Sequence, residues 1–203
     1  SIHIPHSMSG TYQSALNASK NINNSTIDII DGFSASVGLG LIVIKIAKLA
    51  AKGKKHDEIL NKIDEILNST SLYLVVKDLR YIVKGGRLPG IIKKIANLLN
   101  IRPILTANAM GKLKLDSVLF GQSKMVEKFA KKLNKKIDSK LYYRLVVAHS
   151  NCQESAEKFL AHITKKNTNI LSSYIVEIGC ALGVHAGPGS LVVGLQQLTK
   201  DEI

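Results

Sequence analysis

Residues 26–51 read TIDIIDGFSASVGLGLIVIKIAKLAA: a short apolar run, a turn of small residues and then a long apolar segment. The run 26–30 is typical of a buried parallel strand that ends at Asp31-Gly32. The small residues 34–36 precede a helix that we expect to extend to about Ala51. Ahead of this unit, residues 2–4 are typical of a strand end and residues 12–22 of a helix with one apolar face. The first part of the chain therefore has βαβ character.

The rest of the chain also alternates between the two periodicities. Helices are expected at 56–68, 78–83, 91–99, 123–137 and 153–166, and strands at 71–77, 101–107, 112–119, 141–148, 169–178 and 190–195. The strands 101–107 and 112–119 flank Met110-Gly111-Lys112, which is typical of a hairpin. These patterns predict an α/β protein in two parts: residues 1–77, the remainder of an N-terminal βαβ domain, and residues 78–203, a C-terminal α/β domain with a mixed or antiparallel sheet.

The net charge of +13 is the one unusual bulk property of the 203 residues. It is concentrated in residues 78–203, which carry a balance of +11 against +2 for residues 1–77. Such asymmetry is expected either for an acidic partner of the second half or simply for solvated lysines. Exposed aromatic rings support base stacking, and the low aromatic content, without Trp, disfavours a nucleic-acid platform.

A membrane span is not expected, because Lys45 and Lys48 interrupt the longest apolar stretch well short of ~20 residues. Cys152 and Cys180 form no C-x-x-C pair, and this favours a reduced, cytoplasmic setting. The first residues resemble the interior of a strand, which predicts that the front of a larger protein is absent.

Three small-residue segments could carry chemistry. Ser7-Met8-Ser9-Gly10-Thr11 lies at a strand-to-helix turn, where hydroxyls and backbone N–H groups could hold a carboxylate or phosphate, or simply cap the helix. In residues 183–189, GVHAGPG, glycines and a proline would hold His185 on a rigid loop, as a donor to an anion or as an incidental turn residue. Lys84-Gly85-Gly86-Arg87 is either a helix C-cap or a positive rim.

Signals for catalysis or for a metal are weak. The sequence contains no H-E-x-x-H, no G-x-S-x-G and no Walker A loop, and no His pairs with Cys or acid at metal spacing. Cys152 follows His149 at a strand-to-helix turn, a place that could lower the pKa of its thiol. A small hydrolase or transferase that uses His185 or Cys152 is therefore one alternative, and a basic nucleic-acid-binding module is another.

Four segments, taken in order, resemble the DegV family of bacterial fatty-acid-binding proteins. Residues 9–15, SGTYQSA, are similar to the family's S-G-T-Y-Q-S-A segment, and residues 31–40 to its D-S…S-x-G-x-G helix start. Residues 81–87 resemble its Y-x-x-K-G-G-R segment, and residues 185–189 its H-x-G-P-G loop. Two features differ: the family's first βαβ portion is absent, and Pro5 and His6 stand near the place of its usual Ser-Ser pair.

The resemblance implies that a long-chain fatty acid lies between two α/β domains and that a partner fatty acid kinase phosphorylates its carboxylate. It implies no catalysis by this chain, and no cofactor or metal. The carboxylate ligands would be Ser9, Gly10, Thr11 and His185. The remaining pocket residues would be His6, Ser7, Ser36, Gly38, Gly40, Gly187 and Gly189. Partner docking would fall to Lys84, Arg87 and Lys124.

Overall fold

The computed structural model describes residues 1–87, 101–121 and 123–203. The first half contains β1 (Ile2–His3), α1 (Thr11–Ser19), β2 (Ile30–Asp31), α2 (Ser36–Ala51), α3 (His56–Leu60), α4 (Ile63–Asn68), β3 (Thr70–Val75) and α5 (Leu79–Lys84). The second half contains β4 (Ile101–Ala107), β5 (Leu113–Phe120), α7 (Met125–Asn134), β6 (Tyr143–His149), α8 (Gln153–Thr164), β7 (Ile170–Glu177), α9 (Cys180–Ala186), β8 (Leu191–Gln197) and a 3₁₀ turn, Lys200–Glu202. The predicted helix 91–99 lies outside the described residues.

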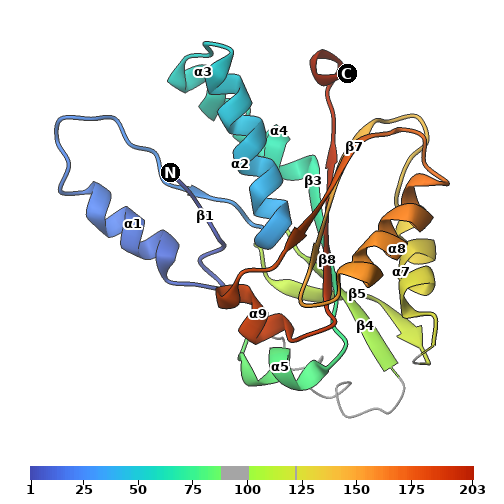
Figure 1. The fold of residues 1–203 in the computed structure, drawn as a ribbon. Helices are drawn as coiled ribbons and strands as arrows, with labels where there is room; N and C mark the ends of the chain where they lie inside the picture. Colours follow the sequence, from blue (N-terminus) through green and yellow to red (C-terminus); the bar gives the residue numbers. More distant parts are fainter. Residues whose placement is uncertain (88–100, 122) are drawn as a thin grey trace.

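Two sheets organise the chain, and they confirm the predicted α/β class. β1 and β2 form a small parallel sheet that lies with α1 to one side of the molecule (Figure 1). The larger sheet has the order β5-β4-β3-β8-β6-β7 and is mixed, because only β6 and β7 run parallel. No helix among the described residues is long and apolar enough to cross a membrane.

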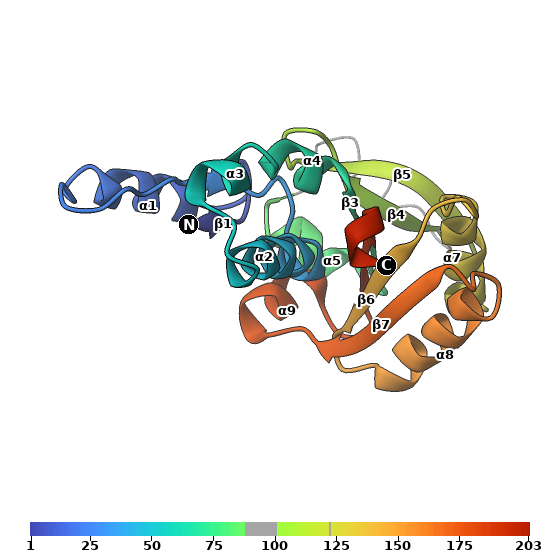
Figure 2. The same cartoon turned by 90° about the horizontal axis from the view of Figure 1, so that it is seen from above.

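Helices cover both faces of the larger sheet, as the view from above shows (Figure 2). Alternate residues of β3 divide between the faces: Tyr73 and Val75 join the core under α7 and α8, where Phe129 and Phe159 pack with ring centroids 4.8 Å apart. Leu72 and Leu74 point to the opposite face and pack with the buried side of α2 and with α5. One face of the sheet is thus a closed core, and the other carries the segments singled out above.

The position of β3 is a feature that sequence periodicity did not reveal. β3 pairs with β4 on one side and with β8 on the other, in the middle of the larger sheet. The strand at the end of residues 1–77 therefore belongs to the sheet that the second half builds. The division into domains at residue 77 stays a prediction.

Three local expectations need correction. The strand predicted at 26–30 is only Ile30–Asp31, because β1 pairs with those two residues alone, and the exposed residues 26 and 27 have no strand partner in the described part of the chain. The helix predicted over 56–68 is two helices, broken between Leu60 and Ile63, although the same apolar residues face inward. The predicted loop at 183–189 is helical through Ala186, since α9 occupies most of it.

Candidate functional site

A cavity of about 430 Å³ lies on the face of the larger sheet that carries α2, α5 and α9, and we call it the apolar cavity. Side chains from β3, β5, β8, α2, α5 and α9 form most of its wall, including Leu39, Leu72, Leu74, Ile82 and Leu182. Among the described residues that line it, the polar ones are Ser9, Thr11, Ser36, Arg87 and His185. The cavity wall is thus mostly apolar with a few polar groups, as the walls of small-molecule sites generally are.

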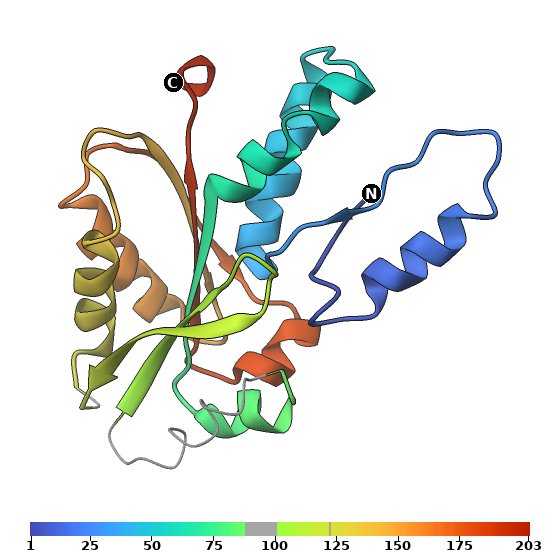
Figure 3. The ribbon, with the colours of Figure 1, turned by 180° about the vertical axis from the view of Figure 1, so that it is seen from behind.

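The loop before α1 brings Ser9 and Thr11 to this cavity. The backbone N–H groups of Met8 and Ser9 both donate to the carbonyl of Pro5, and the N–H of Thr11 donates to Ser9 Oγ over 3.3 Å. The turn between β4 and β5 lies beside this loop (Figure 3). There, Ser7 Oγ donates to the carbonyl of Met110, and a side chain at Gly111 would overlap Pro5.

The N-terminus of α2 also borders the cavity, through Ala35 and Ser36. Ala35 is extended, Ser36 has a positive φ of 51°, and no side chain among the described residues caps the helix. The first N–H groups of a helix have no intrahelical partner, and the helix dipole makes this end positive. The backbone here is therefore suited to receive an anionic group.

Two glycines let α5 and α9 pack closely, and this contact places His185. A side chain at Gly85, the C-cap of α5, would overlap the imidazole of His185, and one at Gly187 would overlap the ring of Tyr81. Gly187 has φ 71° and ψ 163°, a conformation that essentially only glycine adopts. The rigid turn that we expected around His185 therefore begins just after it, and His185 itself lies in the last turn of α9.

His185 and Arg87 present different polar groups to the cavity. The Nδ1 atom of His185 is buried and has no hydrogen-bond partner among the described residues. Arg87 follows α5, and its Nη1 donates to the carbonyl of Gly85 over 2.6 Å, while its Nε reaches the carbonyl of Met8 at 3.4 Å. Arg87 thus links the loop before α1 to the end of α5, and its guanidinium is the only cationic side chain among the described residues that line the cavity.

Arg87, predicted from the sequence as a partner-docking residue, lies in the wall of the apolar cavity. The sequence does carry a signal for this position. Arg87 directly follows Gly85-Gly86, and a helix C-cap of this kind turns the chain sharply. Gly86 has φ 73°, so the chain does turn at this point.

Several other singled-out residues do not line the apolar cavity. His6 is exposed and pairs through Nδ1 with Asp31 at 2.6 Å, which ties the first loop to β2. Ser7 donates its hydroxyl hydrogen bond to Met110 in the turn between β4 and β5, and Gly10 is the N-cap of α1. Gly38 faces Ser34 and Leu72, where a side chain has no room.

The remaining glycines and lysines also lie outside the cavity wall. Gly40 faces open space, and Gly189, with φ 81°, packs against Lys77. Lys84 is exposed at the end of α5. Lys124 precedes α7, which packs on the opposite face of the larger sheet from α5 (Figure 1).

Cys152 does not have the activated thiol that its position suggested. Burial raises the pKa of this thiol, and the weaker effects of nearby hydrogen bonds and Lys77 do not offset it. Its Sγ contacts the carbonyl of Ser190 at 3.5 Å, and His149 Nδ1 accepts from the backbone N–H of Cys152 at 3.4 Å. The histidine therefore contacts the backbone and not the sulfur. Within the described part of the chain, no three His, Cys, Asp or Glu side chains gather as a metal site.

Comparison with known proteins gives one consistent family. A profile of the DegV family, described as uncharacterised protein, matches residues 1–197. A DegV domain-containing protein of Clostridium perfringens is 32% identical over 198 residues, which cover 96% of this chain and 68% of the relative.

Solved structures of that family share the fold. The fatty acid kinase B3 protein of Streptococcus pneumoniae, loaded with linoleic acid, superposes with a TM-score of 0.84 at 26% identity, covering 96% of this chain and 70% of the other. The fatty acid binding DegV family protein of Streptococcus agalactiae gives 0.83 at 26% identity, covering 98% and 71%.

Proposed function

This chain belongs to the DegV family, and we propose that it binds a long-chain fatty acid in the apolar cavity and presents the carboxylate to a partner kinase. The observation that carries the proposal is the composition of the cavity. Its wall is apolar except for five polar residues, which come from four separate segments of the chain. Relatives with this fold hold linoleic acid or are named as fatty acid binding.

The tail supplies most of the affinity in this proposal. Each buried methylene contributes about 0.8 kcal/mol, so a chain of some sixteen carbons gives on the order of 12 kcal/mol gross. Association costs of at least ~4 kcal/mol oppose this gain. The apolar side chains of β3, β8 and α2 that line the cavity are the surface against which the tail would pack.

The carboxylate is proposed to lie among Ser9, Thr11, His185 and Arg87. The hydroxyls and the imidazole can each donate a hydrogen bond, and the guanidinium adds the one positive charge. The positive end of the α2 dipole, beside Ser36, adds a favourable field for the carboxylate. Gly10 has no side chain and would contribute only its backbone groups to carboxylate binding. These groups fix which end of the ligand is presented.

Phosphorylation is assigned to the partner and not to this chain. The fatty acid kinase B3 relative is a named component of a kinase system, which supports this division of labour. The exposed Lys84, three residues before the cavity residue Arg87, is the docking residue that we favour. We also infer a cytoplasmic setting, supported by two free cysteines, Cys152 and Cys180.

The test is denaturing mass spectrometry of an organic extract of the purified protein, which should contain a C14–C18 acid. Leu39→Arg places a charge in the cavity wall and should abolish retention of the acid. Ile44→Arg, on the exposed side of the same helix, should not. Equal retention by both variants, or a wild-type extract without any fatty acid after loading with palmitate, would contradict the proposal.

A further inference from the structure

A second cavity, of about 420 Å³, lies at the other end of α2, and we call it the basic cavity. The last turns of α2, helix α4, strand β6 and the 3₁₀ turn at 200–202 form its walls. Five cationic side chains and three carboxylates line it, which leaves an excess of two positive charges. Nothing in the proposed fatty-acid function uses this site, since the apolar cavity meets only the first turns of α2.

Lys45 and Arg144 are the residues that make this cavity unusual, because their side chains are only 7% and 10% exposed. A buried charge is costly unless it is paired and hydrogen-bonded. Lys48 and Lys52 are less informative, because basic side chains at a helix C-terminus are explained by the helix dipole. Lys45 and Arg144, in contrast, are cations that the fold has buried.

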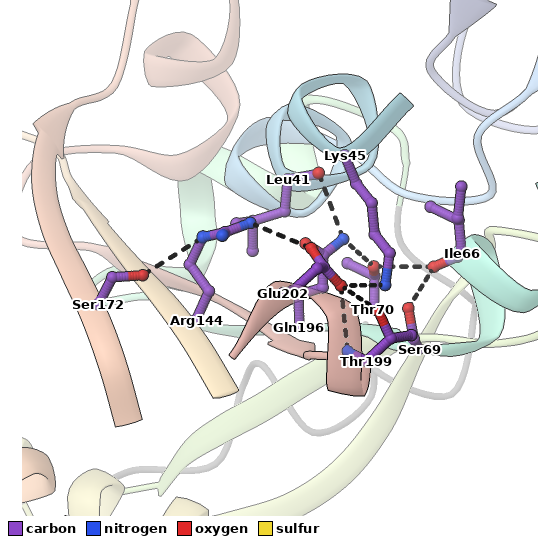
Figure 4. Close-up of polar contacts among 10 residues, drawn as sticks. All are labelled: Leu41, Lys45, Ile66, Ser69, Thr70, Arg144, Ser172, Gln196, Thr199 and Glu202. Carbon is purple, nitrogen blue, oxygen red and sulfur yellow. Dashed lines mark hydrogen bonds and ion pairs between the residues drawn. The ribbon is translucent and has the colours of Figure 1, made fainter. Parts of the chain in front are cut away.

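A single carboxylate, Glu202, serves both of them (Figure 4). Its Oε2 lies 2.8 Å from Lys45 Nζ, whereas its Oε1 lies 3.9 Å from Arg144 Nη1, beyond hydrogen-bond distance. The same Oε2 also accepts from the backbone N–H and the hydroxyl of Thr199. Glu202 is thus shared among several donors, and in the described part of the chain the two buried cations have this one carboxylate between them.

The guanidinium of Arg144 is poorly satisfied. Its Nε donates to Ser172 Oγ at 3.3 Å, and its buried Nη1 has no hydrogen-bond partner in the described part of the chain. Guanidinium presents five N–H donors in a planar fork that matches the oxygens of phosphate. Donors of this kind next to a cavity large enough for a small molecule indicate a missing acceptor.

We propose that the basic cavity binds a phosphate group, held by Arg144 and Lys45. A tetrahedral dianion supplies several acceptor oxygens and neutralises the excess of two charges. Glu202 occupies part of the site from within the chain, and it competes with the anion for Lys45. The shared chemistry is that of phosphate, either as the free anion or as a phosphomonoester.

Isothermal titration calorimetry with inorganic phosphate at low ionic strength tests this proposal. We expect one saturable site per chain. Arg144→Met and Lys45→Met should each weaken binding by about tenfold or more, because each removes charge-assisted hydrogen bonds. Glu202→Gln removes the competing carboxylate and should strengthen binding. A parallel titration with adenosine monophosphate distinguishes a phosphomonoester site from one for the free anion, and binding of either supports the proposal.

The matched control is Lys131→Met, which removes the same charge from an exposed position on α7, across the larger sheet. It should leave phosphate binding unchanged. If Lys131→Met weakens binding as much as Lys45→Met, the net charge of +13 attracts the anion and the proposal is wrong. Absence of saturable binding to the wild type also overturns it. Arg144→Lys, which keeps the charge but loses the fork, covers the case in which Arg144→Met does not fold; it should still bind more weakly than wild type.

Discussion

Gly85 packs so closely against the imidazole of His185 that a methyl group at this glycine would overlap the Nδ1 atom. The contact joins the end of α5 to the last turn of α9, so two segments far apart in the sequence fix each other's position. Gly85 has an ordinary helical φ of −63°, so the requirement for glycine is one of space and not of backbone conformation. The orientation of His185 toward the apolar cavity thus depends on a residue that would never touch the ligand.

Gly85→Ala should therefore displace His185. We expect a loss of stability of about 1–3 kcal/mol, typical of overpacking, together with a change in the chemical shifts of the His185 ring. The control is Gly183→Ala on α9, where an added methyl group meets no atom and improves helix propensity. Thermal unfolding and NMR of the histidine ring check both variants. An unchanged His185 signal in Gly85→Ala would show that the contact does not hold the ring.

His185→Ala should weaken fatty acid affinity only about three- to tenfold, because a single hydrogen bond contributes ~0.5–1.5 kcal/mol and the tail supplies most of the binding. Phosphorylation by the cognate kinase should fall much further, since a carboxylate displaced by about 1 Å can lose on the order of a hundredfold in rate. The measurement pairs a palmitate titration with a phosphorylation assay. A thousandfold loss of affinity with normal phosphorylation of the bound acid would make His185 an affinity anchor instead.

Arg87→Met should cost more affinity than His185→Ala. The guanidinium carries a full charge of its own and can donate two hydrogen bonds to the carboxylate, so its loss should cost ~1.5–3 kcal/mol, which corresponds to roughly ten- to hundredfold. Lys84→Met removes the same charge from an exposed position three residues earlier, outside the cavity wall, and should leave affinity unchanged. Titration with palmitate and with 1-hexadecanol separates a carboxylate contact from a contact with the tail, because only the acid should respond to Arg87→Met. Equal losses for both ligands would place Arg87 in the wall and not at the carboxylate.

Stability should depend on pH through Glu202. Burial would raise the pKa of this carboxyl, but the hydrogen bonds from Lys45 and Thr199 outweigh burial and hold the pKa below its ordinary value of 4.5. A lowered folded-state pKa gives stability that is present above pH 4.5 and lost as the pH falls through the lowered pKa. Glu202→Gln should therefore be less stable than wild type at pH 7, by about 1.5–3 kcal/mol.

Urea unfolding of both proteins at pH 7 and at pH 3.5 measures the effect. The difference between wild type and Glu202→Gln should shrink at the lower pH, because the unfolded chain takes up a proton at Glu202 below pH 4.5 while the lowered pKa of the folded state resists it. Glu154→Gln is the control, since its partner Lys158 lies on the exposed face of α8 and such pairs contribute little. A constant difference across the pH range would show that Glu202 acts by packing and not by charge.

Local patterns in the sequence were sufficient for the class of fold and for most of its elements. Strand and helix periods report which side of a segment is buried, and this information is local. The hairpin of β4 and β5, the amphipathic helices α7 and α8 and the long helix α2 all follow from such patterns. The expectation for residues 26–30 was wrong because composition indicates a strand but does not supply the neighbours that would bury it.

The sequence also marked the chemistry of the apolar cavity but could not assemble it. Small-residue turns around Ser9, Arg87 and His185 were visible as segments that depart from helix and strand patterns. That they share one cavity depends on the packing of α5 against α9 and on the first loop folding back to Arg87. Such contacts join residues far apart in the chain, and no spacing rule encodes them.

The tertiary structure alone decided two features, the order of strands in the larger sheet and the basic cavity. β3 pairs along its whole length with β8, near the C-terminus, because the alternating apolar residues of both strands bury their two faces only in the middle of the sheet. In the sequence, Lys45 merely interrupts an apolar stretch. In the folded chain it becomes a buried cation, because α2 packs that face against β6 and β8 and brings Arg144 and Glu202 beside it. Lysine is usually found at the surface, and only its burial beside Arg144 and Glu202 makes Lys45 part of a candidate anion site. That burial is set by the whole fold.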